Sequence, residues 1–175
     1  QTGFIKDNWG RSSSDCLQLS FPENLIMALQ GQLNIEGRTY GVVECEYEFS
    51  QGTDNTGKPS SRPRGGLITF VMPATCDDDQ FFYKWMFSKT LTYSGTFRFC
   101  VFSNDNKRRF KTVEFSQAFC IGLKDNFCDS DSKLMYTTVT ISAGVIRVGT
   151  GVMDSALFSN EWASLEGMID MMTKY

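Results

Sequence analysis

The sequence of 175 residues contains no histidine. Histidine is the usual general base near neutral pH and the commonest metal ligand in proteins. A nucleophilic enzyme would have to use a lysine or a carboxylate as its base, and no serine or cysteine of this chain lies in a nucleophile motif. These absences argue against an enzyme and against a histidine-based metal site.

The six cysteines lack the C-x-x-C spacing that is typical of zinc sites. Several of them fall within strand-like patterns, where cysteine behaves as a small apolar residue. We therefore expect free thiols rather than a disulfide framework, which fits a protein that assembles inside a cell. The six are Cys16, Cys45, Cys76, Cys100, Cys120 and Cys128.

Long apolar runs and a strong net charge are missing as well. No run approaches the roughly 20 apolar residues of a membrane span, and the first residues lack the basic start and apolar core of a secretory signal. The net charge is −3 and the isoelectric point is about 5.0, so the whole chain has no attraction to nucleic acid or to anionic membranes. We expect no nucleic-acid partner and no membrane insertion.

Residues 47–70, by contrast, contain a long stretch that is rich in turn-forming residues. Two strand-like runs there flank a centre that is dense in glycine, proline, serine, asparagine and aspartate, the residues that turn a backbone. Loops of this length are uncommon unless they have a function. We therefore expect this loop to do more than connect two strands.

The order of residues in the loop, S-Q-G-T-D-x-T-G-K-P-S-S-x-x-R-G-G over residues 50–66, resembles the Hcp tube-protein family of type VI secretion systems, in the form found in Bacteroidota. Four further pieces agree: an acidic, aromatic helix at 77–88, F-S-Q-A-F-C at 115–120, T-T-V-T-I-S at 137–142, and N-E-W at 160–162. Each motif is weak alone, and G-K-P-S-S lacks the spacing of a nucleotide-binding loop. Their order along residues 27–162 carries the resemblance.

The resemblance implies what the protein does. In that family six barrels form a ring, rings stack into a hollow tube, and a contractile sheath drives the tube into a target cell. The chain would then be a homo-oligomeric structural subunit without catalysis or cofactor, with sheath, spike and effector proteins as partners. It would assemble in the cytoplasm and be exported into target cells or the medium without a cleaved signal peptide.

A second class of function stays open. A small barrel rich in aromatic residues could be a small-ligand- or carbohydrate-binding module whose cavity holds the ligand. Such a module would be a monomer, so the oligomeric state separates the two interpretations.

The long loop is the candidate contact between subunits. A short turn would suffice to join two strands, and its two prolines lower the entropy that is lost when the loop docks. The paired glycines at its end permit backbone conformations that other residues avoid. We expect the inter-subunit contact at Asp54, Thr56, Gly57, Lys58, Pro59, Ser60, Ser61, Arg62, Arg64, Gly65 and Gly66.

Ahead of the loop, alternating residues predict a hairpin. Residues 29–35 read as a half-buried strand that ends at a Glu36-Gly37 turn. A change of phase in the return strand predicts a bulge near Gly41. The change gathers three acids on one face, either a solvated strand face or half of a charged contact with another subunit: Glu44, Glu46 and Glu48.

Beyond the loop, residues 77–88 are predicted to be a helix. Three aspartates favour its start, and an aromatic stripe recurs at helical spacing. We expect the helix to plug or flank a barrel. The alternative is that its aromatic side chains form a surface on which a cofactor stacks. The stripe comprises Phe81, Phe82, Trp85 and Met86.

A second hairpin can be given a register from its apolar pattern. A three-residue loop at 105–107 would place Phe97 opposite Phe115 and Arg98 opposite Glu114, whereas a two-residue loop would oppose Phe97 to Glu114. We therefore expect the three-residue loop. Its basic tip is expected to be solvated, with phosphate binding as the alternative.

These patterns predict a mainly β fold, a closed or nearly closed antiparallel β-barrel with one internal α-helix. The barrel domain is expected over residues 27–152, after an N-terminal extension or leader at 1–26. Residues 134–148 read as one long strand, which Gly144 allows to bend. The tail at 153–175 has apolar spacing that predicts a helix, with Gly167 as a point where it can split, and it either docks on the barrel or binds a partner.

Overall fold

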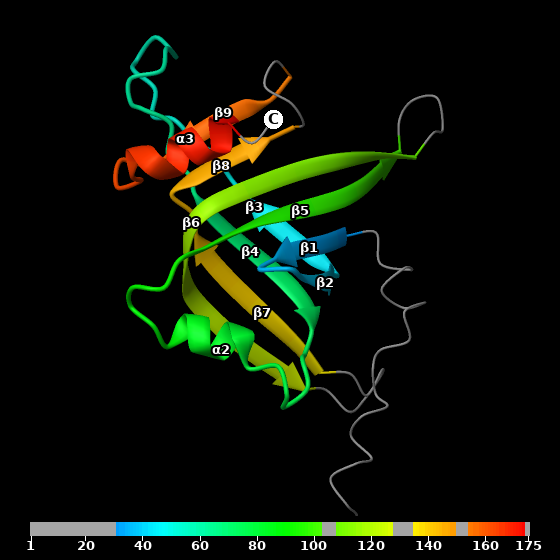
Figure 1. Cartoon of the computed structure of the whole chain (residues 1–175). Helices are drawn as coiled ribbons and strands as arrows, with labels where there is room; N and C mark the ends of the chain where they lie inside the picture. Colours follow the sequence, from blue (N-terminus) through cyan, green and yellow to red (C-terminus); the bar gives the residue numbers. More distant parts are fainter. Residues whose placement is uncertain (1–30, 103–107, 128–134, 150–153, 174–175) are drawn as a thin grey trace, which may run out of the picture.

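The structure, a computed structural model, describes residues 31–102, 108–127, 135–149 and 154–173. The expected extension at 1–26, the loop at 105–107, Cys16 and Cys128 lie outside the described residues. The strands are β1 (Gly31–Ile35), β2 (Arg38–Val42), β3 (Glu44–Tyr47), β4 (Leu67–Pro73), β5 (Tyr93–Phe102), β6 (Arg108–Phe127), β7 (Met135–Ser142), β8 (Val145–Val148) and β9 (Ala156–Ser159), and the helices are α2 (Phe81–Met86) and α3 (Leu165–Thr173) (Figure 1).

The strands pair into a curled antiparallel sheet. The main path runs β2-β1-β5-β6-β7-β4-β3, and β8 and then β9 branch from β6. Its two ends, β2 and β3, are consecutive in the chain, and Val43 between them donates its N–H to the carbonyl of Val71 at 2.8 Å. The prediction of a nearly closed antiparallel barrel is thus confirmed.

The strand β6 joins the two halves of this sheet. Its first part pairs with β5 and β8, and its second part pairs with β7. A left-handed backbone at Gln117, with φ of 52°, and a register shift between Cys120 and Gly122 interrupt the regular strand between these parts. Irregularities of this kind bend a strand, so one continuous segment serves both halves.

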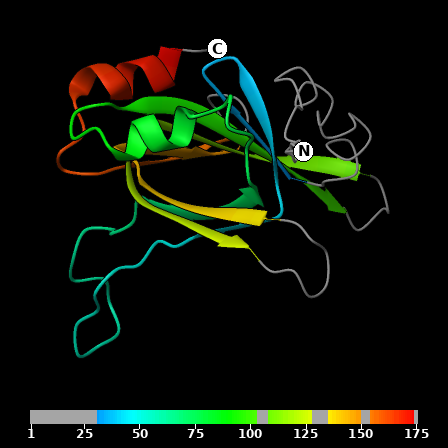
Figure 2. The ribbon, with the colours of Figure 1, turned by 90° about the horizontal axis from the view of Figure 1, so that it is seen from below.

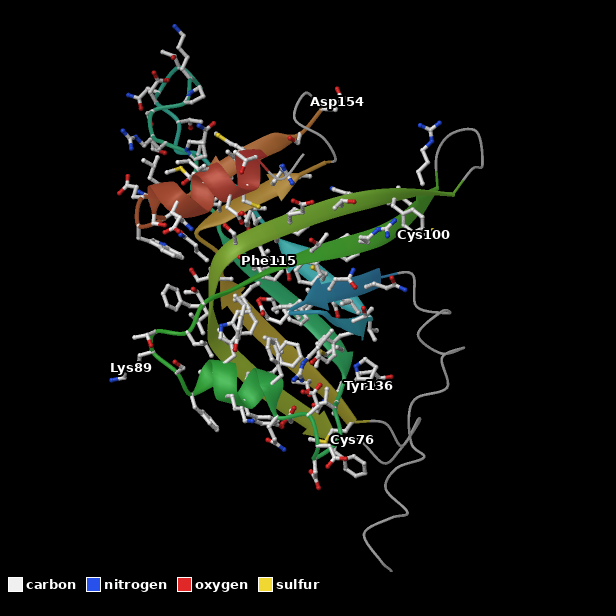
Figure 3. All side chains as sticks on the ribbon, in the orientation of Figure 1. Cys76, Lys89, Cys100, Phe115, Tyr136 and Asp154 are labelled. Carbon is white, nitrogen blue, oxygen red and sulfur yellow. The ribbon has the colours of Figure 1, made fainter. Side chains whose placement is uncertain are left out.

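Aromatic and branched side chains fill the interior. From α2, Trp85 reaches this core with 0% of its surface exposed, and its indole N–H donates to the carbonyl of Leu91 at 3.2 Å. Figure 3 shows Phe115 of β6 in the same interior. The predicted aromatic stripe therefore packs in the core, although the helix is shorter than the predicted range of 77–88. The largest fully buried side chains are Trp85, Phe70, Phe82, Phe97, Phe115, Leu33, Ile35, Ile68, Met72, Ile141, Ile146 and Val113.

The first hairpin forms as predicted up to its return strand. Ile35 pairs with Arg38 across Glu36 and Gly37, whose φ angles of 48° and 71° suit a tight hairpin turn. The prediction of a bulge near Gly41 is wrong, because β2 pairs with β1 in a continuous register up to Val42. The change of phase marks instead the end of β2, after which the chain leaves β1 and pairs with β4 through β3.

The predicted register of the β5–β6 hairpin is also wrong. Phe97 lies opposite Val113 rather than Phe115, and Arg98 lies opposite Thr112 rather than Glu114. The two registers differ by two residues, and side chains alternate faces with a period of two, so both keep the same residues on the core face. The apolar pattern therefore could not distinguish them.

The C-terminal part differs from the prediction in three places. Residues 134–148 contain two strands, β7 and β8, separated at Ala143 and Gly144. The segment that contains Leu157 is strand β9, not helix, and it pairs with β8. The helix α3 continues through Gly167 without a split. Among the described residues, neither helix is long and apolar enough to cross a bilayer.

Candidate functional site

Residues 50–64 form an irregular hairpin, which we call the arm, between β3 and β4. At its base Ser50 donates its N–H to the Arg64 carbonyl at 2.9 Å and accepts from the Arg64 N–H at 2.7 Å. Figures 1 and 2 show the arm reaching away from the sheet. All its residues are exposed except Ser61, which is half-buried. The arm therefore offers its surface to whatever lies beside the subunit.

The tip of the arm is held in shape by Asp54. Its Oδ1 accepts hydrogen bonds from the Thr56 hydroxyl at 2.7 Å, the Thr56 N–H at 2.8 Å and the Lys58 N–H at 3.0 Å. The hydrogen bond from the Thr56 side chain, followed by those from the backbone of Lys58 and Thr56, lowers the pKa of this carboxyl. Such a side-chain-to-backbone turn orders the tip without help from another element.

A second set of contacts orders the middle of the arm. Gly52 donates its N–H to the Ser61 hydroxyl at 2.8 Å, and the Ser60 N–H donates to the Gly52 carbonyl at 2.8 Å. Among the predicted contact residues, the side chain of Ser61 therefore supports the arm from within. The side chains of Lys58 and Arg62 are exposed and available for contact.

The two glycines at the end of the loop are required by close approach. A Cβ at Gly65 would lie 2.4 Å from Cδ1 of Phe49. Gly66 has φ of 95°, and a Cβ there would lie 2.2 Å from Nδ2 of Asn160 and 2.8 Å from the carbonyl oxygen of Ala143. Any side chain at either position would push the arm away from the sheet.

Asn160 ties the base of the arm to the strand break between β7 and β8. Its Nδ2 donates to the Ala143 carbonyl at 2.8 Å, and its backbone N–H donates to the Gly144 carbonyl at 2.8 Å. Ala143 in turn donates its N–H to the Gly66 carbonyl at 2.7 Å. We call Gly66, Gln117, Ala143, Gly144 and Asn160 the junction.

Gln117 completes the junction from β6. Its carbonyl accepts from the Gly144 N–H at 3.3 Å, and its Oε1 accepts from the Ser164 N–H at 2.9 Å, next to the start of α3. A Cβ at Gly167 would lie 2.4 Å from Cδ of Gln117, so the glycine lets α3 approach. The indole ring of Trp162 packs against the ring of Phe119, with 5.5 Å between the ring centroids.

The junction thus brings together motifs that are far apart in the sequence. The glycine pair, F-S-Q-A-F-C, the residues after T-T-V-T-I-S, and N-E-W all contribute to it. Gln117 and Asn160 lie within these motifs, but the sequence alone assigned neither residue a role. Their order along the chain was the available signal, and their proximity arises only in the folded protein.

A groove of about 830 Å³ lies between the base of the arm and the segment that runs from β9 into α3. Arg62 and Arg64 line one side, and Leu157, Trp162 and Met168 line the other. A nitrogen of Arg62 lies 3.9 Å from a carboxylate oxygen of Glu161, and both side chains are more than four-fifths exposed. Such an exposed ion pair contributes little to the stability of the fold.

The cysteines in the described part of the chain are free thiols: Cys45, Cys76, Cys100 and Cys120. Burial raises the pKa of the Cys45 thiol to about 12 and that of Cys120 to about 11, which suppresses the reactive thiolate. Within the described ranges, no three His, Cys, Asp or Glu side chains gather as a metal site would require.

Comparison with known proteins identifies the fold. The solved structure of Hcp1 from Flavobacterium johnsoniae is 27% identical, with a TM-score of 0.62 over 75% of this chain and 100% of that one. A mutant Hcp1 from E. coli EAEC 042 (15% identity, TM-score 0.56, 77% and 99% covered) and Hcp1 from Salmonella typhimurium (10%, 0.53, 74% and 90%) share the fold. No curated protein sequence matches significantly.

The family model described as "Hemolysin coregulated protein Hcp (TssD)" matches residues 27–163. This range begins where the sequence resemblance begins, and it includes the arm, the core strands and the whole junction. The chain therefore belongs to the Hcp (TssD) family, the tube proteins of type VI secretion.

Proposed function

We propose that the chain is a structural subunit of the type VI secretion inner tube, and that it forms hexameric rings that stack end to end. The observation that carries this proposal is the family match over residues 27–163, together with a shared fold at 27% identity to an Hcp1 protein. The contractile sheath propels such a tube, and spike and effector proteins are its further partners. Assembly takes place in the cytoplasm, and export needs no cleaved signal peptide.

We further propose that the protein has no catalytic activity and no cofactor. The packed interior supports a structural role, because Trp85, Phe70 and Phe97 each have 0% of their surface exposed. A ligand-binding barrel would instead use this interior as its cavity. The alternative of a carbohydrate or small-ligand module is therefore not favoured.

The arm is proposed to contact a neighbouring subunit or the next ring. It is exposed, and its tip is already ordered by Asp54, so docking costs less conformational entropy than docking a flexible loop would. Its exposed side chains supply the contact, whereas Gly65 and Gly66 set its direction from the sheet.

The proposed ring can be tested by light scattering and negative-stain electron microscopy. We expect ring-shaped particles with about six times the chain mass of 19.8 kDa. A mass equal to one chain at micromolar concentration would refute the proposal, because a stable interface would persist at that dilution.

The arm is tested by replacing residues 52–64 with a short Gly/Ser connection. We expect the far-ultraviolet circular dichroism of a folded barrel but impaired ring formation or stacking, seen by electron microscopy. Lys89→Ala, an exposed change beyond α2 (Figure 3), serves as the control. If the shortened protein forms rings and tubes like the parent, the arm is a passive connector.

A further inference from the structure

The helix α3 presents an apolar stripe to solvent. Leu165, Ile169 and Met172 recur at the spacing of one helix face, and their exposed fractions are 69%, 50% and 57%. The opposite face is docked, since only 2% of the surface of Met171 is exposed. The helix begins at residue 165, just past the family match, which ends at residue 163.

Hydrogen bonds hold α3, and with it this exposed stripe, against the sheet. Arg147 of β8, itself 3% exposed, donates to the Met171 carbonyl and pairs with Glu114 of β6. At the other end of the helix, the Ser164 N–H donates to Gln117. Both ends of α3 are therefore fixed, and its outer face has a defined position.

The stripe is bordered by acidic residues. Glu166 and Asp170 each follow a stripe residue by one position, which places them about 100° further around the helix. Residues 155–173 contain three acids, with Glu161 as the third, and no lysine or arginine. This segment is acidic and apolar, and Arg62 and Arg64 of the arm lie across the groove from it.

The outer end of the β5–β6 hairpin has the opposite charge. The guanidinium of Arg98 lies over the ring of Phe110 at 4.8 Å from its centroid, and Phe110 is 59% exposed. Residues 95–102 and 108–113 contain four basic residues and no acid. This end, marked by Cys100 in Figure 3, lies at the far side of the molecule from α3 in Figures 1 and 2.

We propose that the stripe of α3 docks on the Arg98–Phe110 surface of a second copy of this chain, a contact that rests on the proposed ring. The two surfaces are both apolar and carry opposite charge, which favours their association. They also lie at opposite ends, so the contact is head-to-tail and repeats around a ring. A symmetric contact of α3 with itself would bring acids against acids.

The test exchanges charges across the proposed contact. Asp170→Arg on the helix and Arg98→Glu on the hairpin are each expected to raise the protein concentration at which half the rings dissociate by about tenfold, because each places like charges together. The double variant exchanges the charges and is expected to recover most of the loss. Lys89→Glu is the control, since this exposed residue lies near neither surface.

Ile169→Ser tests the apolar part of the contact at a position where half of the side-chain surface is exposed. It too is expected to weaken the rings, while circular dichroism stays unchanged. Mass photometry over a dilution series gives the readout for all variants.

The outcomes separate this inference from the proposed function. If the parent forms rings and the single variants form them equally well, or if the double variant recovers nothing, the docking is wrong and the tube subunit stands. If the parent is a monomer, the proposed function is wrong and the docking with it.

Discussion

The replacement Gly66→Ala tests the geometry of the junction most directly. Gly66 has φ of 95°, outside the range that residues with a Cβ prefer. The added methyl group would also meet Nδ2 of Asn160 at 2.2 Å and the Ala143 carbonyl oxygen at 2.8 Å. The substitution therefore combines backbone strain with a steric clash.

The expected loss in the free energy of unfolding follows from these two effects. A residue other than glycine in an unfavourable backbone region costs about 1–3 kcal/mol. Displacing Asn160 breaks its hydrogen bond to the Ala143 carbonyl, a loss of about 0.5–1.5 kcal/mol. We expect Gly66→Ala to lower the free energy of unfolding by about 2–4 kcal/mol.

A second glycine provides the matched control. Gly57 at the tip of the arm also has a positive φ, 84°, but a Cβ there would have nothing within 4 Å. Gly57→Ala therefore keeps the backbone strain and omits the clash, and we expect a loss of only about 1–2 kcal/mol. The difference between the two variants measures the steric part.

Urea denaturation followed by tryptophan fluorescence gives both values. All samples need the same protein concentration, because assembly contributes to the apparent stability of an oligomer. If Gly66→Ala destabilises no more than Gly57→Ala, the close approach to Asn160 does not limit the fold, and the role assigned to the glycine pair is incorrect.

Three further predictions concern ionisable groups. The Asp54 carboxyl should titrate in NMR below the ordinary aspartate pKa, because the Thr56 side chain donates a hydrogen bond to it. Its contribution to the stability of the arm should therefore be fully present above the pKa of the unfolded chain and should be lost as the pH falls through the lowered pKa of the folded protein. Arg147→Met should lower the free energy of unfolding by about 3–5 kcal/mol in thermal or urea unfolding, since it removes the guanidinium that pairs with the buried carboxylate of Glu114. Changing both residues to apolar ones should recover most of that loss. Cys45, whose pKa burial raises to about 12, should resist iodoacetamide at pH 8 until urea unfolds the chain, and rapid labelling of the native protein would contradict its burial.

The sequence predicts local features of this fold well. The Glu36-Gly37 turn is specified by two adjacent residues, and the aromatic stripe of α2 by its spacing. Both depend on side chains that are close along the chain. The antiparallel barrel follows from the same alternation, repeated in several segments.

Features that depend on pairing between distant segments could not be predicted in the same way. A register change of two residues leaves the faces of β5 and β6 unchanged. The phase change at Val43 signals an irregularity, yet a bulge and a change of partner strand give the same pattern. At the junction, Asn160 meets Gly66 across 94 residues of chain, and no local pattern specifies that contact.

The length of β6 has a mechanical consequence. At a rise of about 3.3 Å per residue, its 20 residues would extend about 66 Å if straight, and they bend to serve both halves of the sheet. A force applied to one half reaches the other through the covalent backbone of this strand as well as through packed side chains. Because β6 is hydrogen-bonded to β5 and β8 in one half and to β7 in the other, separating the two halves would require hydrogen bonds along this strand to break.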